Sequence, residues 1–350
     1  MVVLIDNEIA SEVIDRNRVI ESIESAFRQL GCGDATFIPR TDIVAPTEIG
    51  EYYSWGSMAG AILDPPRLAL RFKSDVMKYV DVDGKSIEEK FNVKPGIFMG
   101  VVLLFDMVDG ALLAIMKDGV IQHERVGATA AVACKYLSNE DSSILGIIGS
   151  GGMAKSYARN ISRVRKIEEI RVYSPTKTNR ESFAEEMSDE MGIEVHPVEE
   201  PIKVTYGADI IATCTSSQQS VFSHEWLEPG VTVLDVRSTE IDEKTIQMVD
   251  KVFSTTNKNH SVKMVGGGVE EEYQAKRGKR GFVGTNYTTL SEIVSKKGIG
   301  RENKTETIYY NNRSSGIQFA AVGNLVFECA REQKLGNEIP IEWFQQSIRN

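Results

Sequence analysis

The chain is 350 residues long, with 41% hydrophobic residues, 26% charged residues and a formal net charge of −10. Because a single hydrophobic core rarely grows beyond roughly 250–300 residues, this length predicts two domains. The apolar content excludes a disordered chain, and the acidic balance, without a basic stripe, gives no indication of a nucleic-acid partner. The one short basic cluster, residues 276–280, is interpreted as a solvated loop.

No segment has the length and the apolar character of a membrane span. The longest apolar stretch, residues 95–116, is interrupted by Asp106 and Asp109, and the first residues lack the basic and apolar regions of a signal peptide. The four cysteines have no CxxC or metal-ligand spacing, and the histidines are scattered. The sequence therefore predicts reduced, mostly buried cysteines, no metal site and a cytoplasmic protein.

The N-terminal third mixes helical and strand-like patterns. Apolar residues recur at threes and fours over residues 10–30, which predicts a helix. Residues 36–80 alternate short strand-like pieces with turns, and residues 101–105 and 111–115 predict two strands joined by a hairpin turn. Small residues over 127–137 predict a further helix.

From about residue 140 the pattern changes to alternating strands and helices, which is typical of a doubly wound parallel sheet. Helices are expected to begin near residues 154, 180 and 202, and an apolar, alanine-rich helix is expected over 316–333. The predicted strands are residues 145–148, 169–173, 210–213, 231–236 and 251–254.

A glycine-rich turn between the first of these strands and the next helix predicts a dinucleotide-binding site. Gly149 allows the tight turn, Gly151 lets the backbone approach phosphate, and Ala154 lets helix and strand pack closely. Gly152 and Met153 open the helix, whose free N–H groups and positive dipole end favour a pyrophosphate anion.

The end of the second strand bears on the choice between NAD and NADP. An Asp or Glu there normally accepts hydrogen bonds from the adenosine ribose of NAD. This chain instead has Ser174, Thr176 and Lys177, with Arg180 close behind, and no acid. Hydroxyls and two cations can accommodate a 2′-phosphate, so NADP is favoured within NAD(P). The alternative is a solvated helix start with incidental basic residues.

Several further segments, spread over nearly the whole chain, form one recognisable set. They are Pro39-Arg40, Arg71-Phe72-Lys73, residues 101–115, Arg125 with residues 127–131, residues 135–137, 149–154, 208–211 and 213–217. Together they resemble the ornithine cyclodeaminase/mu-crystallin family. The resemblance implies an α/β fold in which a doubly wound Rossmann domain, residues 139–311, lies against an α+β substrate-binding and dimerisation domain, residues 1–138 and 312–350.

The resemblance also implies the roles of individual residues. Arg40 and Arg125 correspond to the clamp for the substrate carboxylate, and Lys73 corresponds to the catalytic lysine. A planar guanidinium binds a carboxylate through two parallel hydrogen bonds, which an ammonium cannot do. Lys73 follows an apolar run, and partial burial would lower its pKa toward a useful acid–base range. The alternative for each cation is a surface or salt-bridged role. The cofactor contacts implied after the third strand are Thr213, Thr215 and Ser216.

Two acids of the family pattern are missing from this chain. Cyclodeaminases place an aspartate after the strand corresponding to residues 231–236, where it helps to position the substrate amine. Here Asp235 and Glu240 are the nearest acids, and each is either a catalytic substitute or a structural residue. Ala321 stands where a later acid is expected. The chain is therefore interpreted as part of a divergent branch.

These features predict an NAD(P)-dependent oxidoreductase acting on the Cα–N bond of an amino acid or cyclic imino acid, as an amino-acid dehydrogenase or ketimine reductase. One alternative is an ornithine cyclodeaminase, which forms L-proline and ammonia from L-ornithine and recycles its cofactor. A second alternative is a non-catalytic, crystallin-like or amine-oxidase-associated binding protein. We expect a small amino or imino acid as ligand, a homodimer, and no nucleic-acid or membrane partner.

Overall fold

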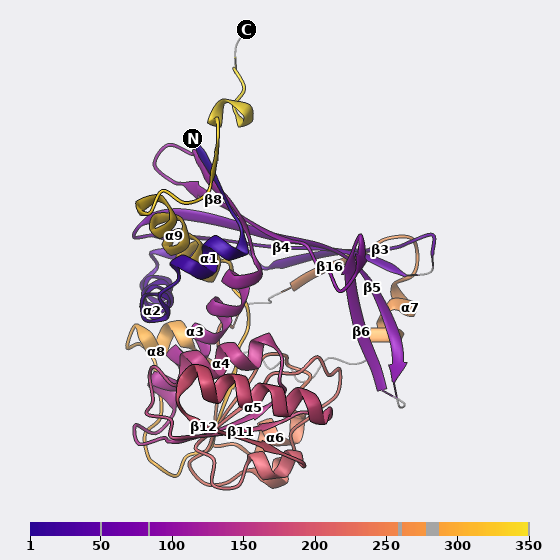
Figure 1. The fold of residues 1–350 in the computed structure, drawn as a ribbon, viewed down its shortest axis with the longest axis vertical. Coiled ribbons are helices and arrows are strands. Elements are labelled where there is room, and N and C mark those ends of the chain that lie inside the picture. Colours follow the sequence, from indigo (N-terminus) through magenta and orange to yellow (C-terminus); the bar gives the residue numbers. More distant parts are fainter. Residues whose placement is uncertain (50, 83–84, 258–260, 278–286, 349–350) are drawn as a thin grey trace.

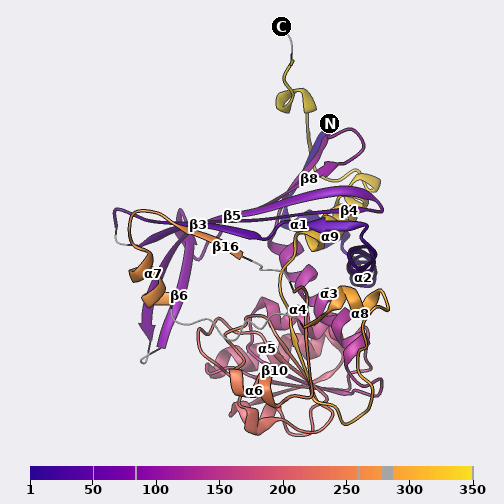
Figure 2. The same cartoon turned by 180° about the vertical axis from the view of Figure 1, so that it is seen from behind.

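The chain forms two sheets, with the helix α3 (Gly119–Leu137) running between them, as Figures 1 and 2 show. The computed structural model describes all residues except 50, 83–84, 258–260, 278–286 and 349–350. The upper sheet in these views is largely antiparallel and contains the long strands of the N-terminal third. The lower sheet is the parallel sheet that the alternating pattern predicted.

The upper sheet has the hydrogen-bonded strand order β16-β3-β4-β5-β8-β9-β1-β19, with β2 on β4 and the β6–β7 pair on β5. Its strands are β1 (Val2–Ile5), β2 (Ala35–Phe37), β3 (Arg40–Pro46), β4 (Tyr52–Leu63), β5 (Pro66–Val82), β6 (Lys85–Asn92), β7 (Lys94–Pro95), β8 (Gly100–Asp106), β9 (Leu112–Lys117), β16 (Ser261–Val265) and β19 (Asn337–Ile339).

Strands β4 and β5 are 12 and 17 residues long, so the expectation of short pieces over residues 36–80 is wrong. The polar Ser54 and the small Gly56 interrupt the apolar alternation in the middle of β4, although the backbone pairing continues through them. The predicted hairpin is confirmed: β8 and β9 are antiparallel, and Gly110 adopts a positive φ of 79° in the turn.

Two helices, α1 (Asn7–Val13) and α2 (Arg16–Cys32), replace the single helix predicted over residues 10–30. Asp15 ends the first pattern and caps the second helix, because its carboxylate accepts hydrogen bonds from the backbone N–H groups of Asn17 and Arg18. Helix α3 begins eight residues earlier than its small-residue pattern predicted.

Helix α9 (Gly316–Glu332) packs directly on β4 and β5, as its apolar, alanine-rich sequence predicted. A Cβ atom added at Gly60 of β4 would lie 2.3 Å from the backbone N of Ile317, and one at Gly316 would lie 2.1 Å from the carbonyl carbon of Ala59. Two glycines therefore allow backbone to meet backbone. This close approach places the residues just before α9 beside β4 of the upper sheet.

All the strand pairs of the lower sheet are parallel, in the order β12-β11-β10-β13-β14-β18-β15-β17. The doubly wound Rossmann fold is thus confirmed, with all five predicted strands. The strands are β10 (Ile144–Ile148), β11 (Glu169–Tyr173), β12 (Glu194–Val198), β13 (Ile210–Thr213), β14 (Thr232–Asp235), β15 (Lys251–Ser254), β17 (Thr288–Thr289) and β18 (Ile308–Asn311).

The helices of this half are α4 (Gly152–Ile161), α5 (Lys177–Met191), α6 (Glu243–Met248) and α8 (Leu290–Val294). The helix predicted near residue 202 is only a 3₁₀ turn, Pro201–Val204, and that prediction is wrong. Gly207 follows it with a positive φ of 62°, which turns the chain into β13.

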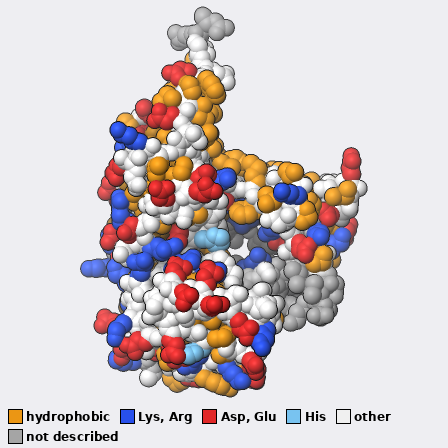
Figure 3. Space-filling view, in the orientation of Figure 1, with side chains coloured by type: hydrophobic (Ala, Val, Ile, Leu, Met, Phe, Trp, Pro, Cys, Tyr) orange, Lys and Arg blue, Asp and Glu red, His pale blue; other side chains and the backbone are white. Residues whose placement is uncertain are grey.

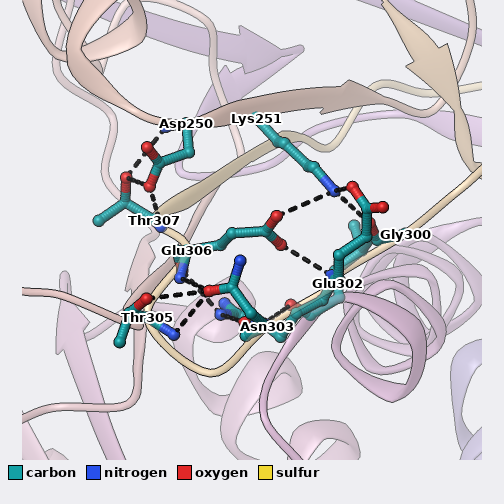
Figure 4. A network of polar contacts seen from close by, with 10 residues as sticks. Asp250, Lys251, Gly300, Glu302, Asn303, Thr305, Glu306 and Thr307 are labelled. Carbon is teal, nitrogen blue, oxygen red and sulfur yellow. Dashed lines mark hydrogen bonds and ion pairs between the residues drawn. The ribbon is translucent and has the colours of Figure 1, made fainter.

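Strand β18 was not predicted, and the loop before it is fixed by the network in Figure 4. Lys251 Nζ lies 2.6 Å from Glu302 Oε2 and 3.1 Å from Glu306 Oε1. The carboxylate of Asp250 accepts hydrogen bonds from the backbone N–H and hydroxyl of Thr307. The network therefore fastens the start of β18 between β14 and β15, and the carboxyl end of β18 delivers the next residues to the gap between the sheets.

Strand β16 crosses from the lower half and pairs with β3. Helix α7 (Glu270–Arg277) follows it and contacts β6, so residues 261–277 belong with the upper sheet rather than with the predicted Rossmann range. The start of the basic cluster lies in α7, not in a loop, and residues 278–280 lie outside the described residues.

No helix in the part of the chain that the structure describes has the length and hydropathy needed to cross a bilayer. The four cysteines are free; Cys134, Cys214 and Cys329 are buried and Cys32 is exposed, as expected for mostly buried thiols.

Candidate active site

A cleft of about 570 Å³ lies between the two sheets. Figure 3 shows the hollow from one face, with Lys and Arg side chains at its margin. Its lining includes the three predicted cations of the upper sheet and α3, together with Met153 and Thr215 of the Rossmann domain. The structure thus brings residues of both predicted domains to one cavity.

The glycine turn of the Rossmann domain is built to receive a phosphate group. Gly149 has a φ of 117°, and a Cβ atom there would lie 2.3 Å from the carbonyl oxygen of Cys214. Beside Gly151, by contrast, a Cβ atom would meet open space. Gly151 caps α4 without any side-chain hydrogen bond, so no capping side chain occupies the first N–H groups of this ten-residue helix, and such groups bind anions. The residues therefore fit a dinucleotide pyrophosphate.

The rest of the turn packs against α3. A Cβ atom at Gly152 would lie 2.8 Å from Nε2 of His123, and Ala154 is fully buried. Met153 is the member of the turn that lines the cleft. Helix α3 thus supports the phosphate-binding turn from behind while its other face carries Arg125.

The predicted adenosine-side residues lie at the start of α5, outside the residues that line the cleft. Thr176 occupies the N-cap position, and its hydroxyl makes no capping hydrogen bond. Lys177 is exposed, and a guanidinium nitrogen of Arg180 donates to the carbonyl oxygen of the buried Ser174 at 3.1 Å. Residues 174–180 include no carboxylate, and the nearest acid, Glu181, lies 3.7 Å from Lys177 Nζ.

Glu240 does not reach the cleft, so the prediction that it acts on the substrate is corrected. Its side chain is fully buried, and its carboxylate accepts hydrogen bonds from Thr213 and Thr215 and from the backbone N–H groups of Val236 and Arg237. Burial raises the pKa of this carboxyl. Glu240 thereby joins the carboxyl ends of β13 and β14 and holds Thr215, Val236 and Arg237 at the cleft wall.

Asp235 is likewise a structural acid and not the predicted catalytic one. It is fully buried and accepts hydrogen bonds from the Tyr309 hydroxyl at 2.6 Å, the Asn311 amide at 2.7 Å and the Asn312 backbone N–H at 3.0 Å. Burial raises its pKa. It ties β14 to the end of β18. Of the predicted cofactor residues nearby, Thr215 lines the cleft, whereas Thr213 is buried in its strand and Ser216 is exposed outside the lining.

On the upper sheet, a row of paired positions brings Asp42, Gly56 and Lys73 side by side on β3, β4 and β5. A Cβ atom at Gly56 would lie 2.4 Å from Oδ1 of Asp42 and 3.3 Å from Cε of Lys73. Gly56 therefore makes the space in which these side chains meet. Arg40, two residues before Asp42, binds its carboxylate through Nε at 2.9 Å and Nη2 at 2.8 Å.

Lys73 is 7% exposed and lies at the cleft surface. Its Nζ is 2.6 Å from Oδ2 of Asp75 and 3.4 Å from the hydroxyl of Ser54. Burial lowers its pKa, and the positive charge of Lys90 lowers it further, against the opposing effect of Asp75. The lowered pKa is the one that the position after an apolar run predicted.

Arg125 is 1% exposed and projects from α3 to the cleft. Its guanidinium donates to Gln122, Gln318 and Ser314, each at 2.8 Å, and lies 4.7 Å from the centre of the Phe319 ring. All three hydrogen-bond partners are neutral, and no carboxylate among the described residues forms an ion pair with it. Burial, followed by the charge of Arg71, lowers its pKa to about 9.

Sequence reasoning missed several residues of the cleft. Arg71 belongs to the motif that carried the resemblance, but its pairing with the buried Asp118 at 2.6 Å came only from the structure. Arg237 and Arg313 follow β14 and the unpredicted β18. The glycine in the middle of β4 was the one sequence signal that marked this place, because a strand glycine often indicates close approach of another group.

Rossmann domains with such a turn bind dinucleotides such as NAD(P), and here the turn borders a cleft whose opposite wall is formed by the upper sheet and α3. The chain is therefore an NAD(P)-dependent oxidoreductase. It belongs to the ornithine cyclodeaminase/mu-crystallin family, whose family model matches residues 2–334 and confirms the resemblance.

Individual relatives are enzymes of amino and imino acids. The Delta(1)-pyrroline-2-carboxylate reductase of Bacillus cereus is 31% identical over 247 residues, which cover 69% of this chain and 74% of that protein. An alanine dehydrogenase of Archaeoglobus fulgidus is 25% identical over 296 residues, 79% of this chain and 87% of the relative. The solved structure of Thermococcus litoralis Delta(1)-pyrroline-2-carboxylate reductase, in complex with NADH and L-proline, matches with a TM-score of 0.77 at 27% identity and covers 96% of this chain and all of that one.

Proposed function

We propose that this protein transfers hydride between a nicotinamide dinucleotide and the Cα–N bond of an amino acid or cyclic imino acid, as an amino-acid dehydrogenase or ketimine reductase. The observation that carries the proposal is Arg125: a buried guanidinium at the cleft with three neutral partners and no paired carboxylate among the described residues. Burying a charge without a counterion is costly, and a bound substrate carboxylate would supply the negative charge that Arg125 lacks within the protein.

The substrate is oriented by the cations of the upper sheet and α3. Arg125 binds the α-carboxylate, and Arg40, which is paired with Asp42, offers its remaining N–H donors to the same pocket. Lys73 lies beside the reacting nitrogen. The hydride for the imine carbon would come from a reduced dinucleotide held by the glycine turn of the Rossmann domain. The C=N electron pair then moves onto nitrogen, which takes a proton.

Lys73 provides that proton in the direction of imine reduction. Its lowered pKa makes the ammonium a stronger acid than an exposed lysine, and the 2.6 Å contact with Asp75 holds it in place. Met153 and Thr215 form the wall against which the nicotinamide half of the cofactor would lie, and the glycine turn would hold its pyrophosphate.

The test is oxidation of NADH and NADPH in the presence of cyclic imino acids such as Δ1-pyrroline-2-carboxylate, and of 2-keto acids with ammonia. We expect turnover with at least one of these substrates, and loss of turnover in Arg125→Gln with the dinucleotide affinity preserved. No hydride transfer across the panel, despite tight dinucleotide binding, would favour a crystallin-like or amine-oxidase-associated binding protein instead.

The cyclodeaminase alternative requires a group that receives the distal amine of ornithine. Asp235 and Glu240 are both engaged inside the Rossmann domain, and the acids that line the cleft, Asp42 and Glu88, are paired with Arg40 and Lys90. This pairing supports net oxidation or reduction over cyclisation. Incubation with L-ornithine and catalytic NAD⁺ distinguishes the two, because a cyclodeaminase releases ammonia and forms L-proline.

For the cofactor we propose NADP in preference to NAD. The hydroxyl of Thr176, which makes no capping hydrogen bond, and the cations Lys177 and Arg180 suit a 2′-phosphate. No carboxylate lies among residues 174–180 to accept a ribose hydroxyl, and the nearby Glu181 is paired with Lys177. The ratio of kcat/KM for NADPH over NADH should exceed one and should fall in Lys177→Gln. We also propose a homodimer, as in the dimeric alanine dehydrogenase that shares this fold, and light scattering of the purified protein tests it. Cytoplasmic location stays a prediction.

A further inference from the structure

The cleft carries far more positive than negative charge. Of its described lining residues, eight are Lys or Arg and two are Asp or Glu, in a chain whose net charge is −10. The cleft is thus a basic site within an acidic protein, and such a site attracts anions.

Four of these eight cations are already neutralised by ion pairs within the protein. The ion pairs join Arg40 to Asp42, Arg71 to Asp118, Lys73 to Asp75 and Lys90 to Glu88. Lys263 lies 2.8 Å from the hydroxyl of Tyr273. Within the described residues, three lining arginines have no carboxylate in salt-bridge contact: Arg125, Arg237 and Arg313.

Arg237 and Arg313 belong to the Rossmann wall and lie at matching positions. Strands β14 and β18 are parallel neighbours with Asp235 opposite Asn311, and each arginine comes two residues after its strand end. Both backbones are anchored: the N–H of Arg237 donates to Glu240 at 2.9 Å, and the N–H of Arg313 donates to the Thr255 hydroxyl at 2.8 Å. The two guanidinium groups are therefore carried by fixed backbone at one edge of the sheet.

This pair is near the carboxylate anchor but distinct from it. Ser314, the residue after Arg313, accepts a hydrogen bond from Arg125 at 2.8 Å, so the two sites adjoin along the 311–314 segment. The positive charge of Arg237 also acts on Glu88 of β6, where Lys90, Arg237 and Lys73 together outweigh burial and hold the pKa at about 2. Arg237 and Glu88 both line the cleft, from opposite walls.

We infer that the substrate carries a second anionic group, held by Arg237 and Arg313, so that the enzyme acts on an amino or imino dicarboxylic acid. The inference rests on the proposed function, in which Arg125 takes the first carboxylate. The second carboxylate takes no part in bond changes; it fixes the substrate across the cleft between the two walls. A cofactor pyrophosphate does not need these arginines, because its turn follows β10, two strands away from β14 in the sheet.

The experiment compares diacids with monoacids of equal length on the complex with reduced dinucleotide. Glutarate and pentanoate, and succinate and butanoate, are titrated at constant ionic strength, and their inhibition constants are measured. We expect each diacid to bind at least about tenfold more tightly than its matched monoacid, since a charge-assisted contact is gained. Arg237→Gln and Arg313→Gln should each reduce this preference to less than about threefold and leave the dissociation constant of the dinucleotide unchanged.

The matched control is Arg159→Gln, which removes one positive charge from the Rossmann domain outside the cleft lining, where Arg159 pairs with Glu190. It should keep the diacid preference. Equal binding of diacids and monoacids by the wild type, or a preference that survives both cleft substitutions, overturns the inference. A fall in dinucleotide affinity in Arg237→Gln or Arg313→Gln overturns it too, since the arginines would then serve the cofactor.

The two proposals fail differently. If monoacids bind and Arg125→Gln abolishes their binding, while diacids gain nothing, the second anion site is refuted and the proposed function stands. If neither class binds the dinucleotide complex, both are refuted.

Discussion

Two clusters of charged side chains in this molecule differ in how completely they are paired. Where the start of β15 meets the loop before β18 (Figure 4), Lys251 has two carboxylate partners, and Asp250 is bound by both donor groups of Thr307. In the cleft, Arg125 is more deeply buried than any of these groups and has only neutral partners. The first cluster is complete within the described protein, and the second is completed by a ligand.

This difference separates structural charges from binding charges on physical grounds. For a paired charge, attraction to its partner offsets the free energy lost on desolvation. An unpaired buried cation has no such offset until a ligand binds. Substitutions in the loop should therefore change stability and leave turnover intact. Substitutions at the unpaired arginines of the cleft should do the reverse, whereas Lys73 is both paired with Asp75 and placed to react, so its substitution should affect both quantities.

The largest expected effect is at Lys73. Lys73→Met removes the proton donor, and we expect kcat to fall about 10²- to 10⁴-fold, the usual range for a lost general acid. The lowered pKa of Lys73 predicts that imine reduction by the wild type declines as pH rises through a value below 10.5, because the ammonium form is the active one. The pH profile of kcat measures this limb. If kcat of Lys73→Met declined over the same pH range as that of the wild type, the decline would belong to another titrating group.

The next effect contrasts Arg125 with Arg71, two buried arginines that lie 4.7 and 5.9 Å from the Phe319 ring. Arg125→Gln should lower kcat/KM about 100-fold, as expected when a buried charge pair with a ligand is lost. Its free energy of unfolding should change by less than about 1 kcal/mol, because no carboxylate among the described residues is left unpaired.

Arg71→Gln is the matched variant, because it strands the buried carboxylate of Asp118. We expect a loss of about 3–5 kcal/mol in the free energy of unfolding, measured by urea denaturation. Equal destabilisation in both variants would mean that pairing within the protein does not distinguish the two arginines.

Glu88 tests whether a paired acid of the cleft behaves as a structural charge. Its pKa of about 2 lies below the ordinary 4.5, so the ionised form stabilises the fold above pH 4.5, and this contribution is lost as pH falls toward 2. Relative to Glu88→Gln, the wild type should lose about 1–3 kcal/mol of unfolding free energy across that window. Parallel pH dependences of the two proteins would show that Glu88 is not held ionised in the fold.

The smallest effect is expected at Lys251 of β15, which binds the loop before β18. Lys251→Met removes the centre of a partly exposed network, and we expect a loss of about 1 kcal/mol in unfolding free energy with kcat/KM unchanged. Thermal unfolding and steady-state kinetics on the same preparation check both parts. A fall in turnover of the folded variant would show that this loop acts on the cleft.

The local patterns in the sequence were sufficient for the Rossmann half. Short apolar runs between helical segments predicted five strands, and the glycine turn predicted the phosphate-binding end, because both depend on residues adjacent in the chain. Strand β18 was not predicted because it has only four residues, Ile308–Asn311, and follows a polar loop rather than a helical segment. Their pairing with β14 and β15 is a long-range property.

In the candidate site too, the sequence indicated which residues are present but not which of them pair across the fold. The three cations implied by the resemblance do line one cleft, but pairing decides how each one acts, and pairing was not readable from the sequence. Asp235 and Glu240 were chosen for their chain position near β14. Their carboxylates turn inward to hydrogen-bond donors on β13, β14 and β18, which no local pattern could indicate.

The most direct test of the central claim is a crystal structure of the protein with a reduced dinucleotide and glutarate bound. We predict one carboxylate of glutarate on the guanidinium of Arg125, at about 3 Å, with Lys73 beside it and the nicotinamide ring opposite. A ligand carboxylate bound elsewhere, with Arg125 still engaged only by Gln122, Gln318 and Ser314, would contradict the account.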